Sequence, residues 1–309
     1  MRLIAVCTIV LLSNMIVQAC DACGCSTGGV GFGYVPFQKK HLIGLTYQYN
    51  QFTTEHPPLF ANEDRTTSID DFNTAVLWGR YYFTEKFMVS GYVPFKNNSV
   101  VENSSKTIVR GIGDIRIQPL YGIVNKGNTM SDKQLNLFVG GSLVVPSGRI
   151  DNDTRFTLPN LQPGTGTFSG GISYLFSVRR FNLGFSSEVG TMTYGTNSND
   201  YRFGNEISST NIFFYRFKNE RSTLIPQIGI YQLHRQKDYL YHSLNTKNPF
   251  SGVELIAAQI GSSLYLNSVG LRAYYQIPIS SNLSDGLTTP NRLFTFQFLY
   301  LLNTKKDTK

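Results

Sequence analysis

The chain has 309 residues, a net charge of +8, only 16% charged residues and 13% aromatic residues. Abundant Tyr, Phe and Gly, scarce Cys and low charge favour a single repetitive β structure. The basic residues are scattered without forming a stripe, so nucleic-acid binding is not indicated. After residue 20 no apolar run is long enough for a transmembrane helix.

The N-terminus has the features of a secretory signal peptide. Met1 and Arg2 precede the apolar run LIAVCTIVLLSNMIV, and Val17 and Ala19 occupy the −3 and −1 positions of a cleavage site. We therefore expect residues 1–19 to be removed. Val17 to Cys20 also resembles a loose lipobox, and in that alternative Cys20 would be lipidated.

The mature chain would begin with a C-x-x-C-x-C cluster formed by Cys20, Cys23 and Cys25. Three thiolates can hold Cu(I) or Zn(II), although no His lies nearby to complete a four-ligand zinc site. The alternative, which the cluster favours over metal capture, is a disulfide between two of the three in an oxidising compartment, with the third lipidated or free. Residues 20–40 also contain enough Gly to fold into a barrel as a plug.

The rest of the chain alternates between apolar and polar residues. In the first segment Ile43, Leu45 and Tyr47 lie on one face and small or polar residues lie on the other, which is the period of a β-strand. About twelve such strands follow one another, with the faces of the eighth left open. They are expected near 42–52, 72–83, 87–95, 111–123, 135–145, 168–178, 181–193, 205–217, 224–233, 255–266, 269–279 and 292–302.

The lengths of the strands and of their connections indicate a membrane barrel. Strands of about ten residues can cross a bilayer when tilted, and their outward faces are rich in Phe, Ile and Leu. Long connections, including one expected at 96–110, alternate with short turns, as in outer-membrane barrels. We therefore predict an all-β, antiparallel, up-and-down transmembrane barrel over residues 41–303, with a polar tail at 304–309. A soluble all-β protein would not explain the apolar outward faces behind a signal peptide.

Several short motifs add a family resemblance. They are Gly111-Ile112-Gly113-Asp114, Val145-Pro146-Ser147-Gly148, Leu158-Pro159-Asn160-Leu161-Gln162-Pro163-Gly164-Thr165-Gly166 and Gln276-Ile277-Pro278. Their order and spacing resemble the bacterial outer-membrane barrels of the meta-pathway phenol-degradation or "transporter" family, across most of residues 40–303. The cysteine-rich start resembles a version found in Bacteroidetes-type bacteria. The resemblance implies location in a Gram-negative outer membrane and a connection with aromatic compounds.

Five charged residues are expected to face the lumen: Arg80, Asp114, Arg116, Glu188 and Arg272. They could line a water path or brace the wall as salt bridges, and both interpretations stand at this point. A barrel of about twelve strands lies between the filled interior of eight-stranded barrels and the open channel of sixteen-stranded ones. A narrow pore is therefore plausible.

We expect a channel or transporter for passive uptake of a small, aromatic or hydrophobic solute, gated by the outer loops at 148–167 and 234–252. Its expected partners are outer-membrane lipids and the solute, and no cofactor is needed for passage. The alternative is a copper- or zinc-handling protein that uses the three cysteines. An outer-membrane lipid hydrolase ranks third, because none of the four His lies in a recognisable nucleophile pattern.

Overall fold

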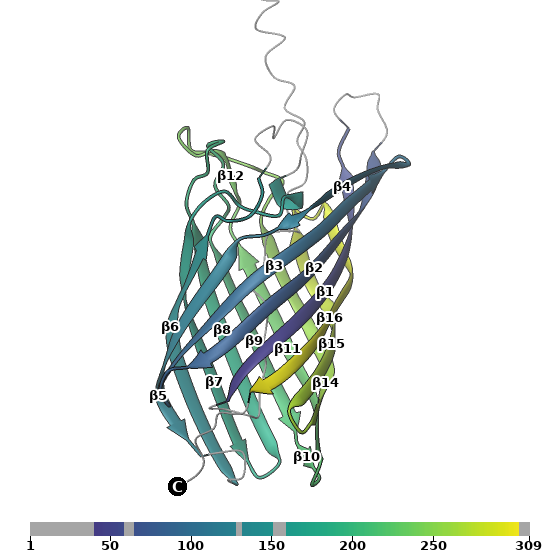
Figure 1. Cartoon of the computed structure of the whole chain (residues 1–309). Coiled ribbons are helices and arrows are strands. Elements are labelled where there is room, and N and C mark those ends of the chain that lie inside the picture. Colours follow the sequence, from purple (N-terminus) through teal and green to yellow (C-terminus); the bar gives the residue numbers. More distant parts are fainter. Residues whose placement is uncertain (1–39, 59–64, 128–131, 151–158, 303–309) are drawn as a thin grey trace, which may run out of the picture.

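A computed structural model of the chain describes residues 40–58, 65–127, 132–150 and 159–302. The predicted signal peptide, the cysteine cluster, nearly all of the segment expected as a plug and the polar tail lie outside the described residues. Twelve long antiparallel strands form a closed barrel (Figure 1). They are β1 (His41–His56), β2 (Thr66–Tyr82), β3 (Phe87–Glu102), β5 (Ile115–Lys126), β6 (Lys133–Val145), β7 (Ser169–Arg180), β8 (Leu183–Tyr194), β9 (Glu206–Tyr215), β11 (Ser222–Arg235), β14 (Val253–Leu266), β15 (Val269–Leu283) and β16 (Thr288–Leu302).

The first and last strands close the barrel. β1 pairs with β2 on one side and with β16 on the other, so that Leu45 lies opposite both Leu77 and Phe298. β9 pairs with β11, which leaves no free edge at the short strand β10 (Phe217–Lys218). The predicted fold class is therefore confirmed. Among the described residues, no helix is both long and apolar enough to cross a membrane.

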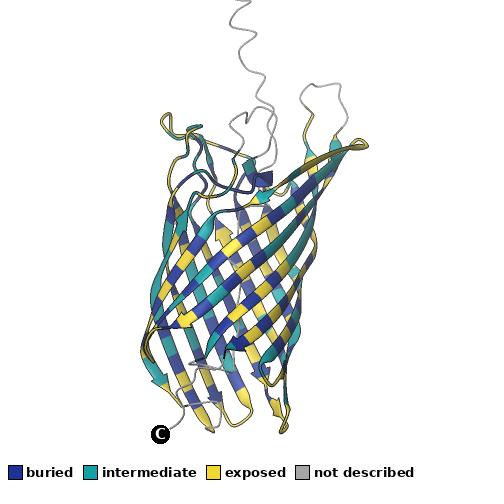
Figure 2. Ribbon diagram, in the orientation of Figure 1, coloured by how far each residue is buried: buried dark blue, intermediate teal, exposed yellow. Residues whose placement is uncertain are grey.

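Burial alternates along each strand, as Figure 2 shows. On β1 and β2, Leu42 and Trp78 are buried inside the barrel, whereas Ile43 and Leu77 are 48% and 55% exposed on its outer wall. The same period places Ile207 and Phe213 of β9 outside, which settles the one strand whose faces the sequence left open. An exposed apolar face of this kind matches the hydrocarbon of a bilayer.

The two ends of the barrel differ. At the lower end in Figure 1, short connections join the strands, the shortest at 181–182 and 267–268. At the upper end the connections are longer, including 146–168 and 236–252, where β12 (Tyr239–Tyr241) and β13 (Thr246–Lys247) form a small hairpin. By the rule for outer-membrane barrels, the upper end faces the cell exterior and the lower end the periplasm.

The prediction of a long loop at 96–110 is wrong. β3 continues to Glu102, and β4 (Ser105–Ile112) returns along it. Asn103 and Ser104 have positive φ values of 46° and 67°, which suit the two-residue turn of a tight hairpin. The polar run Asn97-Asn98-Ser99 resembles a loop in the sequence because this part of the hairpin has no lipid-facing apolar stripe.

The interior is layered along the barrel axis. An outer apolar cluster contains Phe52, Phe72, Leu161, Tyr231, Leu233, Val253, Leu255, Leu283 and Leu293. Near the periplasmic end, a second cluster contains Leu42, Val76, Trp78, Tyr92, Ile212, Phe214, Ile225, Tyr265, Leu299 and Leu301. Between these layers the inward side chains are mainly polar, and this polar belt contains the candidate site.

Candidate functional site: a polar cavity in the barrel lumen

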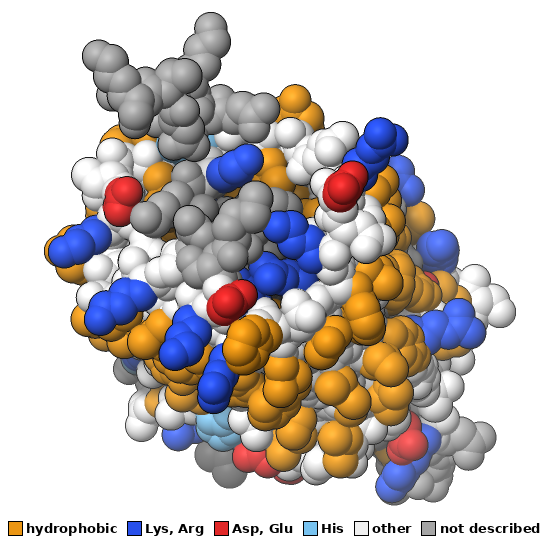
Figure 3. Space-filling view, turned by 90° about the horizontal axis from the view of Figure 1, so that it is seen from below, with side chains coloured by type: hydrophobic (Ala, Val, Ile, Leu, Met, Phe, Trp, Pro, Cys, Tyr) orange, Lys and Arg blue, Asp and Glu red, His pale blue; other side chains and the backbone are white. Residues whose placement is uncertain are grey.

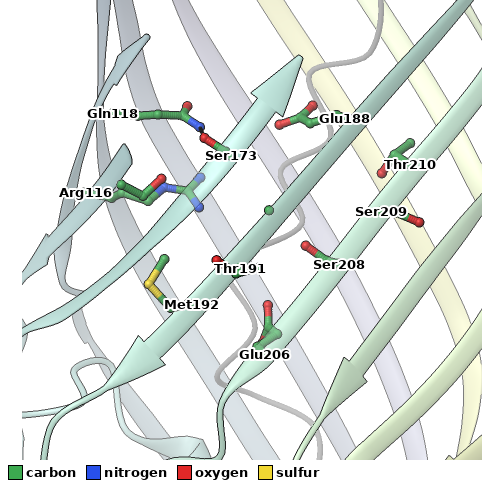
Figure 4. A pocket seen from close by; sticks show the side chains of 12 residues that line it. Arg116, Gln118, Ser173, Glu188, Thr191, Met192, Glu206, Ser208, Ser209 and Thr210 are labelled. Carbon is green, nitrogen blue, oxygen red and sulfur yellow. Dashed lines mark hydrogen bonds between the residues drawn. The ribbon is translucent and has the colours of Figure 1, made fainter. Parts of the chain in front are cut away.

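A cavity of about 480 Å³, part of it open to solvent, lies inside the barrel against β5, β7, β8 and β9 (Figure 4). Its lining includes Arg116 and Gln118 of β5, Ser173 of β7, Glu188 of β8 and Glu206 of β9. A second space of about 240 Å³ shares three of these residues and extends to Arg80 of β2. The two spaces together form a track along one side of the lumen, which we call the polar track, although Leu120 and Leu175 also line its second space.

Arg116 is held in place by its neighbours. Its guanidinium carbon lies 4.5 Å from the centroid of the Tyr92 ring, and the two residues are cross-strand partners. The Tyr92 hydroxyl donates to Gln118 Oε1 at 2.9 Å, and Gln118 Nε2 donates to Ser173 Oγ at 2.9 Å. Arg116 is only 9% exposed, yet its guanidinium has no hydrogen bond or ion pair within the described residues. Its N–H groups are therefore available to the cavity.

Two carboxylates line the other wall of the cavity. Glu188 and Glu206 lie on the adjacent strands β8 and β9, and both project into the cavity with Arg116 (Figure 4). Glu206 is 4% exposed, and its Oε2 atom is buried without a hydrogen-bond partner in the described part of the chain. The cavity therefore has a cationic wall and an anionic wall.

The other two predicted arginines have hydrogen-bonding partners on the barrel wall. Arg80 donates from Nε to Ser90 Oγ at 3.2 Å, and it reaches the second space. Arg272 is 1% exposed and donates from Nε to Ser263 Oγ at 3.0 Å. It also reaches Gln297 Oε1 at 3.4 Å, which places it in the hydrogen-bonded wall formed by β14, β15 and β16. The structure thus brings Arg80, Arg116 and Glu188 to one track, while Arg272 lies away from it.

Asp114 occupies a different place from the lumen position expected for it. It lies at the break between β4 and β5, near the outer end of the barrel. Its carboxylate accepts hydrogen bonds from the Gly148 amide at 2.9 Å, the Thr165 amide at 2.7 Å and the Thr165 hydroxyl at 2.6 Å. Asp114 therefore anchors both ends of the loop between β6 and β7.

The family-like motifs meet at this anchor. A Cβ on Gly148 would lie 2.6 Å from Gly164 Cα, and one on Gly113 would lie 2.9 Å from the Pro163 carbonyl oxygen. The Arg149 amide also donates to the Ile112 carbonyl at 3.2 Å, so the loop covers the edge of β4 that β6 does not reach. We call this contact of the segments 111–114, 146–149 and 163–165 the loop anchor. Its glycines are required because backbones touch there.

The tip of the same loop enters the barrel. The short 3₁₀ helix η2 (Pro159–Leu161) ends in Leu161, which is 2% exposed and belongs to the outer apolar cluster. Asn98 of β3 donates from Nδ2 to the Leu161 carbonyl at 3.0 Å. The loop therefore narrows the outer mouth above the polar cavity. From the sequence, this loop was only one of two expected gates.

The loop at 236–252 is also held by a buried carboxylate. Asp238 accepts hydrogen bonds from the Tyr201 hydroxyl at 2.7 Å and the Gly204 amide at 2.6 Å. Its own amide donates to Ser251 Oγ at 2.8 Å. Burial raises the pKa of the Asp238 carboxyl above its ordinary value. No sequence pattern predicts this anchor, because its four members are spread over about fifty residues.

The periplasmic end of the lumen is basic at its centre. Seen from below, Lys and Arg side chains gather in the middle of this face, inside the apolar side chains of the outer wall (Figure 3). Arg179 at the end of β7 and Arg216 after β9 are buried inward residues of this end. Basic charge therefore continues from the cavity towards the periplasmic opening.

The predicted metal ligands Cys20, Cys23 and Cys25 lie outside the described residues. Within the described ranges, no group of three or more His, Cys, Asp or Glu residues could hold a metal ion. The metal and disulfide interpretations of the cysteine cluster therefore both stay predictions.

The closed barrel and its apolar outer wall define a transmembrane β-barrel of the outer-membrane type. The chain belongs to the family described as "Putative MetA-pathway of phenol degradation", whose model matches residues 61–238. The family suggested by the sequence motifs is thereby confirmed. None of the curated proteins compared with the chain matches it.

Several solved structures share the fold. The COG4313 outer membrane channel from Pseudomonas putida F1 is 12% identical with a TM-score of 0.63, over 88% of this chain and 98% of that one. The translocator domain of autotransporter NalP from Neisseria meningitidis is 11% identical with a TM-score of 0.45, over 88% and 91%. A Pseudomonas aeruginosa FadL homologue is 10% identical with a TM-score of 0.37, over 85% and 90%. At these identities only the first likeness bears on the structure, and it supports the barrel fold alone.

Proposed function

We propose that the protein is a channel for passive uptake of a small solute across the outer membrane, with no catalytic step. The observation that carries this proposal is the polar track from Glu206 past Arg116 and Glu188 to Arg80, inside a closed barrel. Such a track supplies hydrogen-bonding partners to a solute that has left bulk water. The Pseudomonas putida protein that shares this fold is described as an outer membrane channel, which is consistent with this class.

The layering of the lumen supports a preference for small, partly apolar solutes. A solute entering from outside meets the apolar cluster around Leu161 before it reaches the polar cavity, and then the cluster around Trp78. Apolar surface favours contact with aromatic or aliphatic groups, because the transfer of such groups from water to an apolar environment is favourable. The solute class that fits is therefore a small aromatic or hydrophobic molecule with one polar group, in keeping with the phenol connection of the family description.

Conductance of the purified protein in a planar bilayer tests this proposal. We expect discrete single-channel steps of small size, because the loop tip narrows the outer mouth. The recordings are repeated with reductant and with a metal chelator, since the state of the cysteines could affect passage. Absence of steps under every condition, combined with no solute-driven swelling of liposomes, would contradict a channel. A lipid-hydrolysis assay on the same sample is expected to be negative.

The metal-handling alternative has its own test. The protein in which Cys20, Cys23 and Cys25 are all replaced by serine is compared with the wild type for copper and zinc content after purification and dialysis. If the cysteines capture metal, we expect the variant to lose it while the barrel stays folded, because thiolates are the preferred ligands of soft metals. Equal metal content in the two proteins would remove this alternative.

A further inference from the structure

The described interior of the barrel carries an excess of positive charge. Three acidic side chains are buried among the described residues, Asp70, Glu206 and Asp238, and Glu188 adds a half-buried fourth. Seven basic side chains are buried in the same ranges: Arg80, Lys96, Arg116, Arg179, Arg216, Arg235 and Arg272. Within a narrow, low-dielectric wall, fixed charges of one sign raise the local concentration of the opposite ion.

Two of these cations have N–H donors that no described residue accepts from. Neither Arg116 nor Lys96 makes a side-chain hydrogen bond or ion pair within the described residues, although each is more than nine-tenths buried. A buried charge without a partner is costly in free energy. We therefore expect a counter-ion that binds beside it reversibly. Arg116 lines the cavity, so a counter-ion that enters the cavity can bind to it directly.

The surroundings of Arg116 fit an organic anion. The Tyr92 ring covers one face of the guanidinium, which leaves the N–H edge to meet a planar group. A carboxylate matches this edge through two parallel hydrogen bonds, as a spherical ion cannot. The hydroxyls of Ser173, Ser208 and Thr210 line the same cavity and can donate to the anion.

The opposing carboxylates limit where the anion can lie. Glu206 and Glu188 would repel it from the β8–β9 wall and confine it to the β5 side. Glu206 makes no ion pair with Arg116 in the described structure, so the arginine is not neutralised by direct contact. Removal of the Glu206 charge should therefore strengthen the site, and removal of the Arg116 charge should weaken it.

We propose that the cavity is an anion-binding station and that the channel prefers small carboxylates, including aromatic ones, with Arg116 as the specificity-determining residue. This inference rests on the proposed channel function and names the solute class for the same site. The anion crosses by exchanging water for the Arg116 edge and the cavity hydroxyls. It then leaves toward the basic periplasmic end, where Arg179 and Arg216 lie.

Reversal potentials in a KCl gradient across a planar bilayer test the proposal. We expect the wild type to be anion-selective and Arg116→Gln to lower the chloride-to-potassium permeability ratio about fivefold. That factor corresponds to two unit charges about 4 Å apart in a water-like medium. Glu206→Gln is expected to raise the ratio. Arg292→Gln is the matched control, because it removes the same charge from an exposed position on β16, and it should leave the ratio unchanged.

Block by benzoate separates binding from general charge. Added benzoate should reduce chloride current through the wild type, and Arg116→Gln should abolish the block. Arg116→Lys keeps the charge without the planar fork, so it should retain anion selectivity and lose most of the block. Folding of each variant is checked by its heat-dependent gel shift.

The outcomes distinguish failure of the anion preference from failure of the channel function. A conducting wild type that is cation-selective would overturn the inference alone. An Arg116→Gln protein that conducts with unchanged selectivity and unchanged benzoate block would overturn it as well. A wild type that neither conducts nor allows solute-driven swelling of liposomes would contradict the channel itself, and the inference would fall with it.

Discussion

Exchange of Asp114 for asparagine is expected to open the outer mouth of the barrel and to increase single-channel conductance. The Asp114 carboxylate accepts from two backbone amides and one hydroxyl at 2.6–2.9 Å. Hydrogen bonds to a charged group contribute about 1.5–3 kcal/mol each. The NH₂ group of an asparagine cannot accept a hydrogen bond. At least one backbone N–H of the loop would therefore face another donor instead of an acceptor. Loss of one such bond would raise the ratio of detached to attached loop about ten- to a hundredfold.

The experiment combines bilayer recordings with limited proteolysis from the outer side. In Asp114→Asn we expect larger and noisier open states, together with faster cleavage within the loop between β6 and β7. Asp285→Asn is the matched control, because Asp285 is an exposed acid in an outer turn that forms a 3.9 Å ion pair with Lys237. Equal conductance and cleavage in the two variants would show that Asp114 does not hold the loop.

The strands could be predicted from the sequence, because a period-two pattern is imposed by the lipid on every outward side chain. Ile43, Leu45 and Leu77 lie outward as expected, and the count of about twelve strands agrees with the barrel. The pattern fails where that constraint ends. The β3–β4 hairpin has polar side chains on both faces in part of its length, and its turn at Asn103-Ser104 depends on two left-handed backbone conformations.

The site was harder to predict than the fold. Strand parity alone places Arg80, Arg116, Glu188 and Arg272 inside the barrel, but it cannot say which of them share a cavity. That depends on the order of the strands around the barrel and on the side chains that fill the rest of the lumen. Glu206 was missed because it begins a strand whose faces were ambiguous. Asp114 was assigned to the lumen because its hydrogen-bonding partners are in a loop more than thirty residues further along the chain. Such a contact leaves no periodic pattern in the sequence.

Truncation of Trp78 to alanine is expected to enlarge the path through the lower lumen and to destabilise the barrel. This single tryptophan of the chain is 2% exposed, lies at 6.3 Å from the Tyr92 ring and donates from Nε1 to Thr46 Oγ1 at 3.0 Å. Replacing a buried tryptophan by alanine typically costs about 3–5 kcal/mol. Water that fills the new space would offset part of this loss of stability. The same water would widen the path for ions.

Three variants determine whether the solute path passes this side chain. Trp78→Ala should raise conductance and lower the denaturant midpoint, whereas Leu77→Ala removes an outward side chain that is 55% exposed and should leave conductance unchanged. Gly44→Ala should act in the opposite direction, because its Cβ would lie 2.6 Å from the indole and must push the ring into the lumen. A folded Trp78→Ala protein with wild-type conductance would mean that ions bypass the lower apolar layer. The polar track would then have to reach the periplasm on the β5–β8 side of the lumen.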